Sequence, residues 1–161
     1  MIESFDVASN FSAYFSTRLA NEQNKTEGTG SLWAKFDDVT GSINNTDIGG
    51  MVTRVYSSPM DLSGYTTITL DYWISYSISG NAALQVNFVT NGQDDGFNFL
   101  VNISNAQAGW HTIRLNKASP SVTTNGANWS SIRAIRFTFF NYAKNTSPDF
   151  MMFDNMKGIS Y

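Results

Sequence analysis

Acidic residues stand inside apolar, strand-like segments at both ends of this chain. The N-terminal segment reads Ile2-Glu3-Ser4-Phe5-Asp6, and the C-terminal segment runs from Asp149 to Met156 with Asp154 in its middle. A glycine turn, Glu27-Gly28-Thr29-Gly30, lies between them in the sequence. A buried carboxylate is costly unless it is paired or bound to metal, and calcium takes oxygen ligands from side chains and backbone carbonyls. The pattern therefore predicts a β-sandwich pinned by calcium.

Residues that could carry catalysis are harder to assemble. The chain has one histidine, His111, which follows Trp110 at the start of an apolar strand. It has no Gly-x-Ser-x-Gly, Walker or His-Glu-x-x-His motif. The adjacent acids Asp37-Asp38 and Asp94-Asp95 could serve a glycosidase, but their turn-like contexts favour solvated loops. We therefore expect no enzyme; the catalytic alternative requires His111 to meet a carboxylate in a cleft.

Composition narrows the class of protein. The chain has 161 residues, of which 42% are hydrophobic and 14% aromatic, so it can form a core. Only 14% are charged, against roughly 25% in soluble domains, which is typical of an extracellular β-rich protein. The net charge of −3 gives no basis for binding nucleic acid or an anionic membrane. There is no cysteine for a disulfide or thiolate site.

No segment is long and apolar enough to insert into a membrane. The first residues lead directly into a strand and show no signal peptide. Two interpretations follow: a cytosolic protein, or a module of a longer protein that is secreted or belongs to a virion. We favour the module.

The pattern of the chain is all-β. Alternating and apolar runs rich in β-branched and aromatic residues are separated by polar turns, such as Ser79-Gly80-Asn81. We expect a single domain spanning residues 1–161, built as a two-sheet antiparallel β-sandwich of the jelly-roll type. The expected strands cover residues 2–6, 12–20, 31–38, 50–58, 66–78, 82–90, 96–103, 110–115, 131–141 and 149–158.

Six short motifs, in this order, carry a family resemblance. They are the N-terminal Ile-Glu-Ser-Phe-Asp, the Gly-Thr-Gly-Ser-Leu turn, Asp61-Leu62-Ser63-Gly64-Tyr65, Gly109-Trp110-His111-Thr112-Ile113, Trp129-Ser130-Ser131-Ile132-Arg133-Ala134-Ile135, and Phe153-Asp154-Asn155-Met156. The chain resembles the galactose-binding-like jelly rolls of non-catalytic carbohydrate-binding modules, nearest to the β-glucan-binding family 11 group. That group has a Gly-Trp-x-Thr-Ile motif in its middle and a last strand ending in Val-Asp-Asn-Ile.

The resemblance implies a structural Ca²⁺. Carried over by position, its side-chain ligands are Asp6 and Asp154, with Glu3 as a further candidate, and carbonyls near Glu27 and Thr29 complete the shell. The chain departs from the family at Ser4, where a second acid is common. The alternative is that Asp6 and Asp154 are ordinary turn or edge acids.

The resemblance also implies a polysaccharide site on one sheet face, where aromatic rings stack on sugars and polar side chains bind hydroxyls. Phe5, Phe88, Phe137 and Phe153 are expected in the core, as are Trp73 and Trp110. The candidate ligand-binding residues are Asp95, Asn98, Arg54, Arg136, Tyr142, Trp33, Phe139 and Met51.

Several of these candidates have a plainer interpretation. Met51 and Phe139 stand where the family has tyrosines. Arg54 and Arg136 could be salt-bridge partners, and Trp33 could be core. The first functional hypothesis is therefore a carbohydrate-binding module attached to a larger protein. The second is a structural or adhesive sandwich of a virion or cell-surface protein, without a sugar site.

Overall fold

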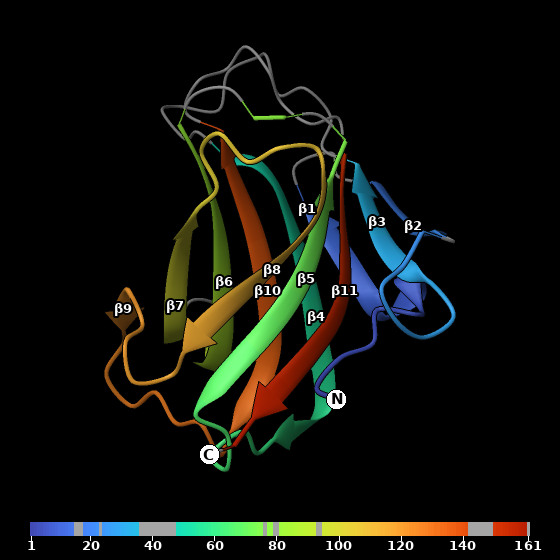
Figure 1. Cartoon of the computed structure of the whole chain (residues 1–161). Helices are drawn as coiled ribbons and strands as arrows, with labels where there is room; N and C mark the ends of the chain where they lie inside the picture. The colour runs from blue at the N-terminus through green and yellow to red at the C-terminus, as the bar shows by residue number, and fades with distance from the viewer. Residues whose placement is uncertain are drawn as a thin grey trace.

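Two antiparallel sheets pack face to face as a sandwich in the computed structural model (Figure 1). The structure describes residues 1–14, 18–22, 24–35, 48–75, 77–78, 81–92, 95–141 and 150–160. This confirms the predicted all-β, two-sheet antiparallel fold. No helix in these ranges is long and apolar enough to cross a membrane.

One sheet has six strands, in the order β1-β4-β10-β6-β7-β9, and the other has five, in the order β2-β3-β11-β5-β8. The six-stranded sheet comprises β1 (Phe11–Tyr14), β4 (Ile48–Met60), β10 (Ile132–Asn141), β6 (Ala82–Asn91), β7 (Asp95–Asn102) and β9 (Val122–Thr123). The five-stranded sheet comprises β2 (Arg18–Glu22), β3 (Ser31–Lys35), β11 (Phe150–Ile159), β5 (Thr67–Ile74) and β8 (Gly109–Asn116). A short 3₁₀ helix, η1 (Ala8–Asn10), precedes β1.

The N-terminal segment differs from expectation. Instead of a strand over residues 2–6, the structure has an isolated bridge between Glu3 and Met156. Phe5 adopts a φ of +63°, a conformation that an extended strand cannot contain. Its side chain is fully buried. The segment therefore anchors one aromatic ring in the core and then turns Asp6 toward the glycine turn.

Aromatic rings join the two sheets. Phe137 of β10 and Phe153 of β11 have ring centroids 4.8 Å apart, and Phe5 stacks on Phe11 at 5.5 Å. Phe88 is also fully buried. The four phenylalanines predicted for the core are therefore confirmed there. Because side chains alternate across a strand, the neighbours of these residues face outward, and those outer faces hold the candidate sites.

Candidate functional site

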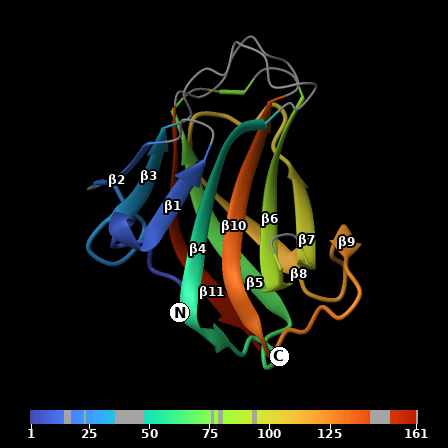
Figure 2. The same ribbon diagram turned by 180° about the vertical axis from the view of Figure 1, so that it is seen from behind.

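A row of polar residues crosses the outer face of the six-stranded sheet. This face is turned toward the viewer in Figure 2. Backbone pairing aligns Thr53 of β4, Arg136 of β10, Asn87 of β6 and Asn98 of β7. The adjacent residues on β10, Ile135 and Phe137, belong to the core, as do their counterparts on β6 and β7. We call Thr53, Arg136, Asn87 and Asn98 the polar row.

Two members of the polar row carry buried atoms without a hydrogen-bond partner. Thr53 is 6% exposed and Asn87 is 5% exposed. The Thr53 hydroxyl oxygen and the Asn87 Oδ1 make no hydrogen bond. Buried polar atoms are normally paired, and leaving one unpaired costs about 1–3 kcal/mol. These two oxygens therefore lie beneath the surface of the polar row with unused hydrogen-bonding capacity.

The next row on the same face is less polar. It contains Met51, Thr138, Gln85 and Leu100 on successive strands. Leu100 is 51% exposed. The Gln85 amide donates a hydrogen bond to Asn98 Oδ1 over 3.2 Å, which links the two rows. Apolar and amide groups therefore lie beside each other, a combination that suits the C–H and O–H groups of a sugar.

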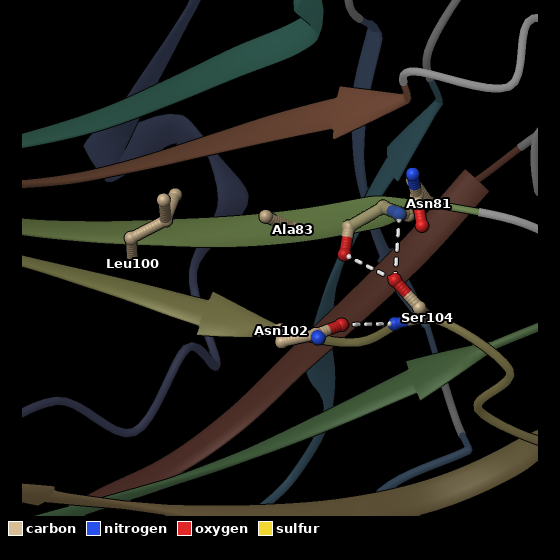
Figure 3. A pocket seen from close by; sticks show the side chains of 6 residues that line it. Asn81, Ala83, Leu100, Asn102 and Ser104 are labelled. Atoms are coloured by element: carbon tan, nitrogen blue, oxygen red, sulfur yellow. Dashed lines mark hydrogen bonds between the residues drawn. The ribbon is translucent and has the colours of Figure 1, made fainter.

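A hollow of about 270 Å³ opens at the end of this face between β6 and β7 (Figure 3). Ser104 fixes its rim: the Ser104 hydroxyl accepts from the Ala82 amide at 3.0 Å, and the Ser104 amide donates to Asn102 Oδ1 at 2.8 Å. Its volume is close to the lower limit for ligand pockets, so it fits one small polar ring. The lining residues are Asn81, Ala82, Ala83, Leu100, Asn102 and Ser104.

Of the predicted ligand-binding residues, the structure places three on this face: Met51, Arg136 and Asn98. Asp95 is exposed at the start of β7, opposite Asn91 at the end of the hairpin. Tyr142 lies outside the described residues. Sequence reasoning missed Thr53 and Asn87. Asn87 could have been found from its place between the apolar Val86 and Phe88, but Thr53, which Arg54 follows, gives no such signal.

Phe139 cannot contribute to this face. Its side chain is 1% exposed and belongs to the core. Strand β10 places residues of the opposite parity, Arg136 and Thr138, on the outer face. The prediction of Phe139 as a ligand-binding residue was therefore wrong.

Arg54 also lies away from the polar row. It shares the inner side of β4 with Val52, at the end covered by the N-terminal segment. Its Nε is 3.2 Å from Glu3 Oε2, and its guanidinium lies 5.0 Å from the centroid of the Tyr56 ring. Arg54 thus takes its alternative role as a salt-bridge partner.

Three tryptophans occupy the other sheet. Trp33, Trp73 and Trp110 all lie on the outer face of the five-stranded sheet, partly exposed. The prediction of Trp33 as part of the same site as Arg136 was therefore wrong, because the sandwich separates them. The core prediction for Trp73 and Trp110 was also wrong, since Ile74 and Ile113 take the inner positions of their strands.

The glycine turn is held by two aspartates, one from each end of the chain. Asp6 Oδ1 accepts hydrogen bonds from the Thr29 amide at 2.7 Å, the Gly30 amide at 2.8 Å and the Thr29 hydroxyl at 3.0 Å. Burial alone would raise the pKa of Asp6, but these hydrogen bonds outweigh it and hold the pKa of this carboxyl below its usual value. Gly28 is required here because it has a φ of +71°, and a Cβ would lie 2.7 Å from Asp6 Oδ1.

Asp154 holds the start of the same turn. It is fully buried, and its Oδ2 accepts from the Thr26 amide at 2.7 Å, the Glu27 amide at 2.9 Å and the Thr26 hydroxyl at 2.9 Å. Asp71 pairs directly with Asp154 across β5 and β11. The same Thr26 hydroxyl lies 2.8 Å from Asp71 Oδ2. One hydroxyl hydrogen cannot serve both carboxylates.

Two of the predicted metal ligands, Glu3 and Glu27, do not point to a common site with Asp154. Glu3 Oε2 contacts Arg54 and the Tyr56 hydroxyl, which lies 3.2 Å away, and Glu27 pairs with Lys157. Burial, followed by the charge of Glu3, raises the pKa of Tyr56. Across the part of the chain that the structure describes, no three His, Cys, Asp or Glu side chains form a group that could hold a metal. Sequence reasoning missed Asp71, which lies directly opposite Asp154 on the neighbouring strand.

His111 is held by neighbours from its own sheet. Its ring stacks on Tyr72 with centroids 5.1 Å apart, and its Nε2 lies 2.6 Å from the Gln107 carbonyl oxygen. Asp37, Asp38 and Asp94 lie outside the described residues. The described contacts of His111 are those of a packed aromatic side chain.

Known structures share the fold of this chain. No protein-family model and no curated protein matches the chain. A family 11 carbohydrate-binding module from Clostridium thermocellum, solved in complex with a β-1,3-1,4-mixed-linked tetrasaccharide, matches with a TM-score of 0.63 and 17% identity, over 98% of this chain and 93% of that one. The chain has the fold of the family 11 modules.

Two further structures share the sandwich. A family 28 module specific for non-crystalline cellulose matches with a TM-score of 0.63 and 14% identity, over 97% of this chain and 91% of that one. An exo-β-agarase matches with a TM-score of 0.59 and 15% identity, over 99% of this chain and 24% of that one. At these identities the likeness concerns the fold.

Proposed function

We propose that this chain is a non-catalytic carbohydrate-binding module that holds a polysaccharide of the β-glucan type on the outer face of the six-stranded sheet. The observation that carries the proposal is the polar row, where the Thr53 hydroxyl and Asn87 Oδ1 are buried without a hydrogen-bond partner. Two sugar hydroxyls, one at each atom, would donate to them once the covering side chains move aside, which recovers the cost of burying them.

The chemistry of the face suits a glycan. Arg136, Asn87 and Asn98 offer donors and acceptors for hydroxyl groups, and Met51 and Leu100 offer apolar contact to C–H faces. The hollow between β6 and β7 provides room for a ring at one end. Asp95 and Tyr142 remain predicted contacts beyond the polar row.

The similar structures support the ligand class. One was solved with a mixed-linked β-glucan tetrasaccharide, and another is described as specific for non-crystalline cellulose. In the agarase the matching region is a part of a larger enzyme. We therefore infer that this chain acts extracellularly as a module of a larger protein and raises the local concentration of its attached partner at a polysaccharide.

Calcium remains part of the proposal, with a revised ligand set. Asp154 Oδ1 is fully buried without a hydrogen-bond partner, and backbone pairing places Asp71 directly opposite Asp154 on the neighbouring strand. A divalent cation bound by these two carboxylates and by carbonyls of the 26–30 turn would neutralise both charges, and oxygen ligands suit Ca²⁺. Asp6 supports the turn from the other side through its amides.

A structural or adhesive role remains the second candidate because apolar side chains are exposed on the same face. Val55, Leu100 and Val122 are 61%, 51% and 55% exposed, and all three are aligned with outward-facing neighbours. Such a face could pack against another protein. This candidate predicts self-association or partner binding, and no affinity for glycans.

Affinity electrophoresis separates the two candidates. The chain, with calcium present, is run through gels containing mixed-linked β-glucan, xylan, mannan or galactan. We expect retardation by the β-glucan, a loss of at least about tenfold in affinity for Arg136→Ala, and unchanged affinity for Arg133→Ala, which removes an exposed arginine of the same strand. A folded wild-type chain that no polysaccharide retards would refute the module and favour the adhesive role.

A further inference from the structure

Three of the four tryptophans form a row across the outer face of the five-stranded sheet, which faces the viewer in Figure 1. Backbone pairing aligns Trp33 of β3 with Met152 of β11, Met152 with Trp73 of β5, and Trp73 with Trp110 of β8. We call Trp33, Met152, Trp73 and Trp110 the tryptophan row. It lies on the side of the sandwich opposite the polar row.

The tryptophan row is a fixed surface. Met152 is 2% exposed yet lies outside the core cluster between the sheets. Its sulfur contacts the Ser31 hydroxyl at 3.7 Å on the outer side. Backbone pairing places Trp33 and Trp73 on either side of Met152. The Trp110 indole N–H donates to Asn24 Oδ1 at 3.1 Å, which sets the orientation of that ring.

Hydrogen-bonding groups border the tryptophan row on one side. The neighbouring row holds Asp154, Asp71 and Thr112. The Thr112 hydroxyl is bound to Asp71 at 2.6 Å, and Thr112 and Asn24 are exposed. Partly exposed indoles beside exposed hydroxyl and amide groups are the combination that binds the C–H faces and hydroxyls of sugars.

The dimensions of the tryptophan row favour a narrow ligand over a protein. A whole indole side chain offers roughly 150–250 Å², so three partly exposed rings present at most a few hundred Å². A stable protein interface requires roughly 800 Å² from each partner. Strands are about 4.8 Å apart, so the row extends over roughly 14 Å. That shape, long and one side chain wide, matches one glycan chain lying across the strands.

We propose that the tryptophan row is a second polysaccharide-binding surface, which stacks consecutive sugar rings of a glycan chain on Trp33, Trp73 and Trp110. This inference rests on the proposed function for the ligand class. The two surfaces face opposite directions, so a single module would bridge two chains and cross-link a soluble polysaccharide.

Indole N–H signals in NMR spectra of the ¹⁵N-labelled full chain test the proposal. During titration with a β-1,3-1,4-mixed-linked tetrasaccharide we expect the signals of Trp33, Trp73 and Trp110 to shift. The Trp129 signal serves as an internal reference, since its ring stacks on Phe97 at 3.9 Å. The Arg136→Ala variant should lose the shifts of the polar row and keep those of the three indoles.

Long mixed-linked β-glucan provides the second readout. Wild-type chain should make the solution turbid by cross-linking, and Trp73→Ala should abolish the turbidity while leaving the polar-row shifts intact. Stationary indole signals together with shifting polar-row amides would overturn this inference and leave the proposed function standing. Shifting indoles with a stationary polar row would support the tryptophan row and overturn the proposed location of the first site. If neither the indole nor the polar-row signals move during titration with the tetrasaccharide, both proposals are wrong.

Discussion

The replacement of Thr53 by valine should raise stability and lower glycan affinity. Valine keeps the shape of threonine and removes the Thr53 hydroxyl, which is buried and makes no hydrogen bond. An unpaired buried polar group costs about 1–3 kcal/mol. We therefore expect a gain of about 1 kcal/mol, which in a domain of this size raises the Tm by roughly 2–4 °C.

The same variant loses one hydrogen bond to the ligand. A neutral hydrogen bond contributes about 1 kcal/mol, so Kd should rise about fivefold. Thermal unfolding and isothermal titration calorimetry with a mixed-linked β-glucan measure the two effects on one preparation.

Thr112→Val is the matched control, because it makes the same chemical change on the other sheet. The Thr112 hydroxyl donates to Asp71 at 2.6 Å, and a hydrogen bond to a charged group contributes about 1.5 kcal/mol or more. This variant should lower the Tm by roughly 3–6 °C. A Thr53→Val variant that is less stable than wild type and binds with unchanged affinity would refute the reasoning. The Thr53 hydroxyl would then stabilise the folded protein and would not bind the ligand.

Three further predictions concern the glycine turn, the metal and Asp95. Gly28→Ala should destabilise the fold by about 2 kcal/mol, because alanine disfavours a φ of +71° and its Cβ would meet Asp6. Gly64→Ala is the control, since a Cβ there meets nothing within 4 Å; equal effects in urea titrations would contradict the account. EDTA should lower the Tm of wild type and not that of Asp154→Ala; a constant wild-type Tm, with no metal by elemental analysis, removes the calcium proposal. Asp95→Ala should weaken glycan binding at least about tenfold with little change in Tm; full affinity in affinity electrophoresis would place the site elsewhere.

The fold could be predicted because strand patterns and turn residues act locally. Alternation in segments such as Ile68 to Ile74 indicated the strand, and the structure buries Ile68, Leu70, Tyr72 and Ile74 on one side of it. The N-terminal segment was mispredicted, since only the packed structure shows that Phe5 leaves the strand conformation to reach the core.

The site was predicted less well because it depends on which side of each strand faces the core. Phe139 and Arg136 lie three residues apart on β10, and their opposite faces follow from strand parity alone. The tryptophans looked like core residues from their apolar neighbours, yet register places them outside. The sequence could not show that Asp71 is a partner of Asp154. The two residues are 83 positions apart and meet only because their strands are neighbours in the sheet.

The central claim is that a β-glucan binds across the polar row. The most direct measurement is a map of backbone amide shifts in the wild-type chain during titration with the mixed-linked tetrasaccharide. We predict large, saturable shifts at Thr53, Arg136, Asn87 and Asn98, beside those at the tryptophan row. Saturable binding with no change at these four amides, or no binding at all by a folded chain, would contradict the account.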